Sequence, residues 1–559
     1  MSQGCDLSVL EELTSNAKQI QDDVLTKILK ANANTEYLSR FLEGSSDKEL
    51  FKKNVPVVSY EDVKPYIDRV ANGEPSDILS GEPITAFTLS CGTSSGNPKI
   101  FPATDNFENI KSADSLNSLI MSKHVDGYNQ GKVMIFRFTH PISTTPCGLP
   151  LAPVVTILMK SKHFLSMEKR STISKEIIRC PDKKQSMYCQ LLCGLVQRDE
   201  VVSVGASFPS VLVQVINFLE KYWKELARNI RSGHLSEWIT DLSCRDSVSI
   251  ILGEPNPELA DLIKKECTGQ ESWPKTKCIE TIVTGTLAQY IPVLEFYSNK
   301  LPLVSKNYAS SETFFGINLN PLSKPEHVSY TFLPNMAYFE FIDVGTEGEI
   351  VDLVDVKLGH YYEPLVTNYY GLHRCRVGDV LQVTGFYNTA PQFRFVRRKN
   401  TVLSIYVEST TEEDLLKALA RAAVVLESSD LIMTGFTCYA DISTVPGHYV
   451  FYLELKAKVN SGTNVLLLDN KVLVEYCCVM EESLSSSYRT LRRQDGLIGA
   501  LEVRIVQKGT FDSLMKFFVS RGASITQYKT PICINSVEAL KVLEDKVLAR
   551  FFSDKSPPI

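Results

Sequence analysis

The sequence has no apolar run that approaches the length of a membrane-spanning helix. It also lacks the Gly-x-Ser-x-Gly elbow of serine hydrolases, the His-Glu-x-x-His pair of zinc proteases and a strand-following Gly-x-Gly-x-x-Gly loop for dinucleotides. Its first residues carry neither a secretory-signal core nor a glycine at position 2 for myristoylation. We therefore expect a cytoplasmic protein without a membrane partner, and these enzyme classes are disfavoured.

The 14 cysteines form no CxxC pair and no Cys/His run at metal spacing. The adjacent Cys477 and Cys478 and the helix-spaced Cys189 and Cys193 are better explained as buried thiols than as ligands. Scattered free thiols are typical of a reducing compartment. The formal net charge of −6 disfavours a sequence-independent grip on nucleic acid. We expect no nucleic-acid partner, and a monomer is the default expectation.

Length and composition indicate a globular protein with more than one domain. A chain of 559 residues exceeds what one hydrophobic core usually organises. Helical spacing of apolar residues over 13–28 is followed, between 281 and 379, by short β-branched and aromatic runs typical of strands. Because the pattern changes just after Arg398, the sequence predicts a large domain over 1–408 and a small one over 409–559.

The small domain has the pattern of an α+β unit. Thr411, followed three residues later by a carboxylate, predicts the start of a capped helix. Residues 449–455 and 501–505 have the character of strands. A last amphipathic helix is expected to carry Val537, Leu540, Val547 and Phe551.

Residues 88–99, Thr-Leu-Ser-Cys-Gly-Thr-Ser-Ser-Gly-Asn-Pro-Lys, follow an apolar run over 84–89 that predicts a strand. Glycines let the backbone approach a ligand, hydroxyl and amide groups donate hydrogen bonds, and Lys99 adds positive charge. The loop therefore suits a polyanion such as phosphate. It is not the common P-loop, because its glycines are too close together and Pro98 precedes the lysine. Taken alone, such a segment is more often an ordinary turn.

Four further segments follow in a fixed order. They are Tyr308-Ala309-Ser310-Ser311-Glu312, Arg374-Cys375-Arg376-Val377-Gly378-Asp379, Phe393-Arg394-Phe395-Val396-Arg397-Arg398 and Gln527-Tyr528-Lys529-Thr530-Pro531. A phosphate loop, a tyrosine-to-glutamate turn, a Gly-Asp turn, a basic hinge and a late lysine form the series of acyl-adenylate-forming enzymes. In detail the chain resembles the plant Gretchen Hagen family of acyl acid amido synthetases, whose usual forms are SSGTSxGxxK, YGSSE and YRVGD. The likeness covers essentially the whole chain.

This resemblance implies an α/β and α+β fold: a large N-terminal domain of mixed β-sheets with a β-barrel-like subdomain flanked by helices, and a small mobile C-terminal domain. It also implies a reaction. A small carboxylic acid, a plant hormone or a benzoate-like compound, would attack the α-phosphorus of ATP in the presence of Mg²⁺, giving an acyl-adenylate and pyrophosphate. An amino acid would then take the acyl group and release AMP.

The resemblance carries site residues with it. The residues expected to hold the nucleotide are Ser90, Cys91, Thr93, Ser94, Asn307, Tyr308, Ser311, Asp379, Phe395 and Arg398. Asp379 would accept both ribose hydroxyls and Tyr308 would lie near adenine. Glu312 would ligate Mg²⁺, and Lys529 would reach the α-phosphate region; these two are the predicted catalytic residues. Seen singly, such residues are more often solvated turn carboxylates, half-buried aromatics or exposed lysines.

A second set of residues is expected to line the acyl-acid pocket: Asn117, Leu119, Thr284, Gly285 and Tyr290. Family members that use benzoate-type or jasmonate-type acids tend to carry an arginine where Asn117 stands. A neutral residue there indicates an acid that is held by other donors or is more apolar than a benzoate. Tyr290 is equally consistent with a pocket wall and with the core.

Three departures from the family forms leave alternatives open. Cys91 replaces a serine, Asn307 stands where threonine commonly precedes the tyrosine, and Ala309 replaces glycine, which would strain a turn of positive φ by about 1 kcal/mol. A catalytically weakened sensor that binds an acyl acid or a nucleotide is therefore one alternative. An acyl-coenzyme A ligase is another, although no basic cluster beyond Arg397-Arg398-Lys399 favours a nucleotide thiol.

Overall fold

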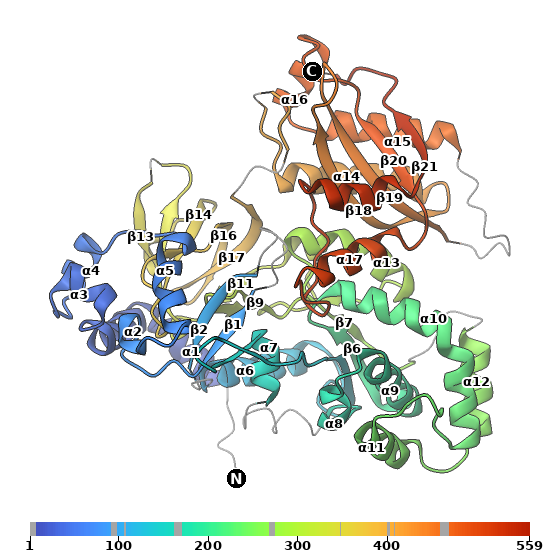
Figure 1. Ribbon diagram of the computed structural model, residues 1–559, viewed down its shortest axis with the longest axis horizontal. Helices are drawn as coiled ribbons and strands as arrows, with labels where there is room; N and C mark the ends of the chain where they lie inside the picture. The colour runs from blue at the N-terminus through green and yellow to red at the C-terminus, as the bar shows by residue number, and fades with distance from the viewer. Residues whose placement is uncertain are drawn as a thin grey trace. The chain divides into compact units, whose positions relative to one another are not determined.

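The computed structural model describes residues 7–90, 98–104, 108–160, 170–267, 274–346, 348–399, 403–406, 408–458 and 469–558 (Figure 1). These residues divide into two compact units: the first comprises those of 99–282 and 301–395 together with the N-terminal 7–90, the second those of 283–300 and 396–558 together with Pro98. The division of domains between residues 408 and 409 stays a prediction. No helix among the described residues combines the length and the apolar character that crossing a membrane requires.

Twelve α-helices belong to the described part of the first unit. They are α1 (Leu7–Ser15), α2 (Ala17–Asn32), α3 (Glu36–Leu42), α4 (Lys48–Asn54), α5 (Tyr60–Ala71), α6 (Glu108–His124), α7 (Val154–Lys160), α8 (Lys175–Arg179), α9 (Lys183–Val196), α10 (Pro209–Ser232), α11 (Leu242–Leu252) and α12 (Pro257–Cys267). The helical pattern over 13–28 is confirmed, but it spans the end of α1 and most of α2. Its apolar residues Val24, Ile28 and Leu29 lie in a core cluster with Phe51 and Val63 of α4 and α5.

Two small sheets of the first unit support the predicted ligand loops. The first has the order β2-β1-β5-β4, with β1 (Ala86–Leu89), β2 (Ile100–Ala103), β4 (Ser143–Thr144) and β5 (Pro150–Ala152). The second has the order β3-β6-β7-β8, with β3 (Lys132–Phe136), β6 (Val201–Ala206), β7 (Cys278–Glu280) and β8 (Leu303–Val304). The strands of the second sheet are all parallel, so their carboxyl ends meet at one edge.

The third sheet of the first unit has nine strands, and antiparallel pairing predominates among its described residues. Its order is β13 (Ile350–Asp352), β12 (Tyr338–Asp343), β14 (Tyr361–Thr367), β16 (Asp379–Tyr387), β17 (Ala390–Arg398), β11 (Tyr330–Phe332), β10 (Phe314–Ile317) and β9 (Asn307–Ala309), with β15 (Cys375–Arg376) beside β14. Phe332, Phe341 and Phe393 pack ring to ring in its interior. The strand-rich pattern is thereby confirmed over most of 281–379.

The second unit is an α+β sandwich, as expected. Its sheet has the order β18-β19-β20-β21, formed by β18 (Leu431–Asp441), β19 (His448–Ala457), β20 (Glu502–Val506) and β21 (Val547–Phe552). Its α-helices are α13 (Ile291–Tyr297), α14 (Glu412–Glu427), α15 (Asn470–Ser483), α16 (Ser486–Arg493), α17 (Thr510–Ser520) and α18 (Val537–Glu544), and a 3₁₀ segment, η4 (Gly285–Tyr290), precedes α13. Residues of β19 alternate between two cores: Phe451 packs with α14 and α15, and Tyr452 packs with α17 and α18.

Two expectations meet their test in the second unit, and one helical segment there was not expected. Thr411 caps α14 and exchanges hydrogen bonds with Asp414, which confirms the predicted helix start. The predicted last helix is wrong beyond Glu544, because Val547–Phe552 forms β21, antiparallel to β20. Val547 and Phe551 are four residues apart, a spacing that fits one face of a helix and equally one face of a strand. Hydrogen bonding to β20 makes this segment a strand. The helical segment of η4 and α13, inside the strand-rich region, was not expected.

Candidate active site

The predicted phosphate loop begins and ends at a pair of strands. β1 and β2 are antiparallel, with Leu89 opposite Ile100, and Ser90 continues the pairing: its N–H donates to Lys99 O at 2.8 Å and its Oγ accepts from Lys99 N at 2.8 Å. The Nζ of Lys99 lies 4.4 Å from the Tyr60 ring centroid and 3.4 Å from Glu61 Oε1. The predicted nucleotide residues Cys91, Thr93 and Ser94 lie outside the described residues.

The tyrosine-to-glutamate segment forms the turn between β9 and β10. Ser310 N–H donates to Thr313 O and closes the turn. Ser310 Oγ donates to Glu312 Oε2 at 2.6 Å, and Asn368 Nδ2 donates to the Glu312 carbonyl at 2.9 Å. These contacts fix the backbone and the carboxylate of Glu312, while Ser311 and Glu312 both keep accessible surface.

Two of the distant motifs meet in one hydrogen bond. The Tyr308 hydroxyl donates to Asp379 Oδ2 at 2.5 Å, and both side chains are buried. The Tyr308 ring stacks on Phe315 with 4.6 Å between centroids, and the ring of Phe395 lies 6.4 Å away, edge-on. Gly378 has φ +80°, a left-handed conformation that glycine adopts without strain, and it places Asp379 at the start of β16. The sequence motifs of Tyr308, Asp379 and Phe395 therefore converge within the first unit.

Asn117, the neutral residue on α6, bonds Asn307, another residue that differs from the family forms. Asn117 is buried, and its Nδ2 donates to Asn307 Oδ1. An arginine and a threonine expected at these places from the family forms are thus replaced by two amides that bond each other. Leu119, on the same helix, keeps partial exposure. Ala309 lies in strand β9 and is not among the described non-glycine residues with positive φ, so the strain considered for this alanine is absent.

The remaining site residues belong to the second unit. Gly285 has φ +60° and opens η4 directly after Thr284. At the other end of η4 the Tyr290 hydroxyl lies 2.9 Å from Thr530 Oγ1, and both residues are buried. The segment of Lys529 is thus tied to the segment of Thr284 and Gly285, across 240 positions. Lys529 itself is partly exposed, and Arg398 is exposed at the end of β17. That these residues meet those of the first unit stays a prediction.

Sequence reasoning missed a buried charge cluster at the carboxyl edge of the parallel sheet. Glu280 ends β7, and its carboxylate accepts hydrogen bonds from Tyr128 at 2.8 Å, Ser203 at 2.6 Å and the Lys306 ammonium at 2.6 Å. Burial alone would lower the pKa of Lys306, but the charge of Glu280 raises it. A Cβ at position 205 of β6 would lie 2.3 Å from Glu280 O, so glycine lets β6 and β7 approach. No motif marks these residues, because their contacts join distant segments.

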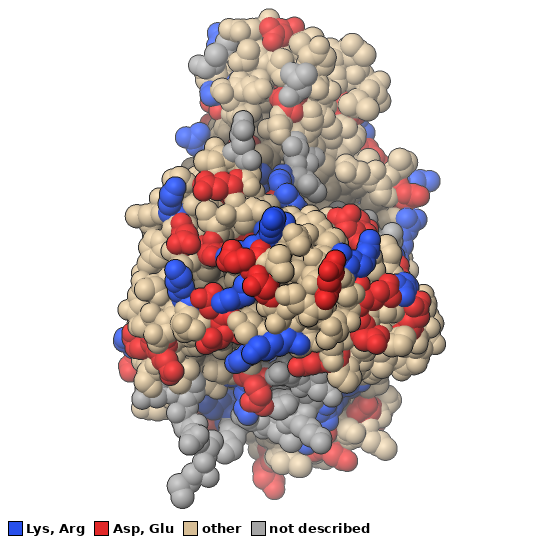
Figure 2. Space-filling view, turned by 90° about the vertical axis from the view of Figure 1, so that its left-hand side faces the viewer, with Lys and Arg blue, Asp and Glu red and all other residues tan. Residues whose placement is uncertain are grey.

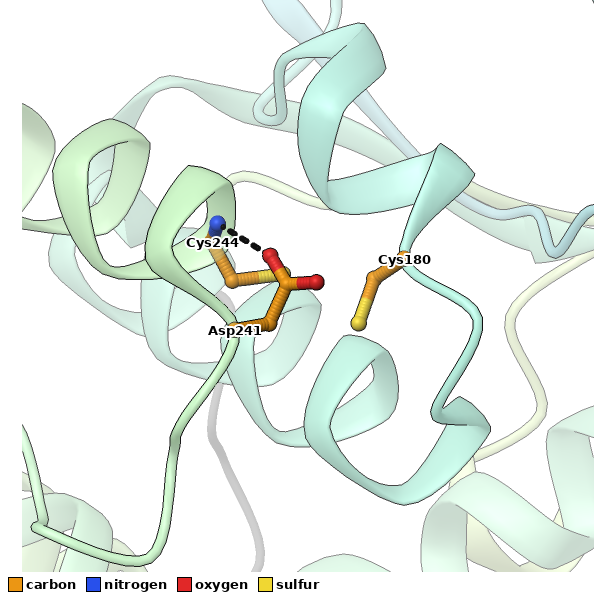
Figure 3. A group of neighbouring side chains, drawn as sticks. All are labelled: Cys180, Asp241 and Cys244. Carbon is orange, nitrogen blue, oxygen red and sulfur yellow. Dashed lines mark hydrogen bonds between the residues drawn. The ribbon is translucent and has the colours of Figure 1, made fainter.

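A second cluster has the donor atoms of a metal site (Figure 3). Ligand atoms of Cys180, Asp241 and Cys244 all lie within 4.8 Å of one another. Burial raises the pKa of Cys180 to about 12, and the nearby Cys189 thiol, together with burial, raises that of Cys244 further, so both thiols are neutral near pH 7. Asp241 Oδ1 accepts from Cys244 N–H at 2.9 Å and caps α11. The closeness of these three side chains is therefore explained by a helix cap packed against buried neutral thiols, without a metal ion.

The surface around α3–α5 carries charges of both signs. Figure 2 shows Lys and Arg side chains interspersed with Asp and Glu over the face it presents, rather than gathered by sign. Arg69 of α5, for example, bonds to Glu36 and to Glu74. The described residues of this face therefore form no extended basic field of the kind that binds a nucleic-acid backbone.

Comparison with known proteins defines the class. A solved structure described as "AtGH3.15 acyl acid amido synthetase in complex with 2,4-DB" matches with a TM-score of 0.91 and 51% identity, over 99% of this chain and 98% of that one. The fold is therefore that of an acyl acid amido synthetase, with a large N-terminal domain of mixed sheets and a smaller α+β C-terminal domain, as expected.

Sequence comparison then gives the family. The chain is 55% identical to the 4-substituted benzoates-glutamate ligase GH3.12 of Arabidopsis thaliana, over 97% of each chain. It is 51% identical to the indole-3-acetic acid-amido synthetase GH3.15 of Arabidopsis thaliana, over 99% of this chain and 96% of that protein. Models of the GH3 family N-terminal, central and C-terminal domains match residues 6–303, 330–398 and 413–538. The chain belongs to the GH3 family.

Proposed function

We propose that this protein is an ATP-dependent acyl acid amido synthetase, a ligase that joins a small carboxylic acid to an amino acid through an acyl-adenylate. The observation that carries the proposal is the Tyr308–Asp379 hydrogen bond, which brings the adenine and ribose motifs together inside a GH3 fold. The named relatives act on 4-substituted benzoates with glutamate and on indole-3-acetic acid. The acid class proposed for this chain is accordingly a plant hormone or a benzoate-like compound.

The reaction needs activation because an oxide is a poor leaving group. In the first half, the loop from Ser90 to Lys99 holds the phosphates while charge grows on the departing pyrophosphate. Asp379 accepts the ribose hydroxyls, with Tyr308 holding the orientation of its carboxylate. In the second half, the amine of the amino acid attacks the activated carbonyl and AMP leaves. Lys529, tied through Thr530 to Tyr290, is the cation proposed to serve the α-phosphate region.

The residues present fit a magnesium ion on the phosphates. Mg²⁺ is commonly bound through one or two carboxylates together with substrate phosphates and water. Glu312 offers one carboxylate, held by Ser310 and kept accessible in the turn between β9 and β10. When bound, the ion would supply charge neutralisation on the phosphate oxygens.

Substrate choice depends on the Asn117–Asn307 pair. Both side chains are uncharged amides and they bond each other, so neither offers a cation to the reacting carboxylate of the acid. The pocket proposed around Asn117, Leu119, Thr284, Gly285 and Tyr290 then holds the reacting carboxylate by shape and neutral donors. We propose that the enzyme works as a cytoplasmic monomer, which size-exclusion chromatography and fractionation would check.

The experiment that tests the proposal is ATP–pyrophosphate exchange across a panel of carboxylic acids. Exchange with any acid establishes adenylation, and the best acid identifies the pocket. Amino acids and then coenzyme A, added to the trapped adenylate, separate an amido synthetase from an acyl-coenzyme A ligase. Flat exchange with every acid, together with measurable ligand binding, would favour the sensor. The unstrained Ala309 removes one reason for expecting a weakened enzyme.

A further inference from the structure

Arg137 follows the last residue of β3, at the carboxyl edge of the parallel sheet. In open parallel sheets, ligands bind outside the carboxyl ends of the strands. The same edge carries Glu280 at the end of β7 and Lys306 two residues after β8. Gln190 bonds the backbone of Arg137 on both sides, donating to its carbonyl at 2.7 Å and accepting from its N–H at 3.2 Å. The backbone is thereby fixed while the guanidinium is left for other contacts.

The charges around Arg137 do not pair with it. Glu280 already accepts from Tyr128, Ser203 and Lys306, and its charge is balanced by the Lys306 ammonium. Asp114 of α6 attracts Arg137 through space, but the two form no ion pair within 4.0 Å. Among the residues that the structure describes, the guanidinium of Arg137 has no hydrogen-bond partner. Its donors are therefore available to a ligand.

Arg137 is half-buried at this edge of the sheet. The side chain keeps accessible surface, yet desolvation lowers its pKa more than Asp114, Glu280 and Tyr128 raise it. The guanidinium is therefore shielded from part of the solvent while some of its surface stays accessible. In such surroundings a cation and a bound anion attract each other more strongly than in water. An anion bound here would replace the favourable interaction with water that the charged guanidinium loses by burial.

We propose that Arg137 binds a carboxylate of one of the two organic substrates, and so sets the enzyme's preference for an acidic ligand at the edge of β3. This inference rests on the proposed function. A guanidinium presents a planar fork that matches the two oxygens of a carboxylate, whereas an ammonium cannot. The carboxylate has two sources, since the acceptor amino acid carries one and the acyl acid can carry a second besides the reacting group.

The test compares Arg137→Met, Arg137→Lys and the control Arg231→Met, which removes an exposed arginine of α10 paired with Asp261. Arg137→Met is expected to raise the KM of one substrate at least tenfold while kcat stays within threefold of the wild-type value. The KM of Arg137→Lys for that substrate is expected to lie between those of the wild type and Arg137→Met. ATP–pyrophosphate exchange contains no amino acid. A raised KM for the acid in exchange identifies the acyl acid as the source. A raised KM confined to the amino acid in amide formation identifies the acceptor. Unchanged KM values for both substrates would overturn the proposal.

A binding measurement keeps this test separate from that of the proposed function. If the wild-type protein exchanges no pyrophosphate with any acid, the proposed function fails, but calorimetry can still titrate glutamate and a panel of acids into both forms. Binding to the wild type that weakens at least tenfold in Arg137→Met supports the carboxylate site. Equal binding to both forms, or no binding to the wild type, refutes it.

Discussion

Arg374 and Arg137, two arginines of the first unit, are both desolvated but bonded in opposite ways. Arg374 donates from Nε and Nη2 to the carboxylate of Glu340, both at 2.9 Å, and from Nη1 to the carbonyls of Lys52 and Val55, both at 2.8 Å. Arg137 has none of these partners within the described part of the chain. A cation whose donors bond mostly to the fold stabilises it, whereas a cation whose donors are unused is available to a ligand.

Arg504 in the second unit repeats the pattern of Arg374. It is buried, and its guanidinium bonds both oxygens of Glu502, the hydroxyls of Tyr439 and Tyr452, and Glu544. Both well-bonded arginines therefore join a strand to other elements of the same unit: Arg374 links β12 to the end of α4, and Arg504 links β20 to β18, β19 and α18. The comparison predicts that substituting a bonded arginine costs stability and that substituting a ligand-binding cation costs activity.

Arg374→Met should have the largest effect on stability. It would leave the Glu340 carboxylate buried without its partner, and breaking a buried pair on one side costs about 3–5 kcal/mol. The free energy of unfolding of the first unit, followed by urea denaturation, is expected to fall by that amount. In the double variant Arg374→Met/Glu340→Met much of the loss should return. If Arg374→Met lowered the free energy of unfolding by less than about 1 kcal/mol, the bonded arginine would not stabilise the fold as the comparison with Arg137 requires.

Acid should weaken the second unit through Glu502. Burial alone raises the pKa of Glu502, but hydrogen bonds from His448 and Arg504 lower it to about 2, below the ordinary value of 4.5. Its stabilisation is therefore complete above pH 4.5 and is lost as the pH falls toward 2. At about 1.4 kcal/mol per pKa unit, the difference corresponds to about 3 kcal/mol.

Hydrogen exchange of β19 and β20 amides in the full chain measures this loss. Glu502→Gln should lower protection near pH 7 and flatten its dependence between pH 4.5 and 2. Parallel curves for wild type and variant over that range would contradict the assignment, since other carboxylates contribute equally to both proteins.

Lys529→Ala tests a cation assigned to a ligand. Turnover is expected to fall at least tenfold, which corresponds to about 1.4 kcal/mol of transition-state stabilisation. The melting temperature should stay unchanged, because Lys529 is partly exposed and the segment remains tied by Thr530 to Tyr290. Lys541→Ala, on the exposed side of α18, is the matched control. Turnover equal to that of the control would remove Lys529 from the site.

The sequence could predict the parts of the site that motifs carry, and not those that only tertiary contacts create. Tyr308 and Asp379 were recognisable because each lies in a short segment of family form, and a hydrogen bond joins them in the structure. Arg137 belongs to no motif: it stands between Phe136 and Phe138, and the run reads as a strand end. Only the parallel order of β3, β6, β7 and β8 brings it to the edge that Glu280 and Lys306 share.

The fold shows the same division between local and distant signals. The start of α14 was predictable because Thr411 and Asp414 form a local cap. The end of the chain was not, since Val547 and Phe551 fit either periodicity until β20 supplies hydrogen bonds. The Asn117–Asn307 bond is likewise invisible in sequence, although each residue was noticed separately as a departure.

Arg137→Met should have little effect on stability, in contrast to Arg374→Met. It removes a desolvated cation and breaks no hydrogen bond with the described residues, so the free energy of unfolding is expected to stay within about 1 kcal/mol of wild type or to rise. Residues shaped for a ligand are commonly kept at some cost in stability. Urea denaturation of both arginine variants under one condition makes the measurement. A loss above about 2 kcal/mol for Arg137→Met would mean that Asp114 acts as its structural counterion, and the two arginines would then differ only in distance to their carboxylates.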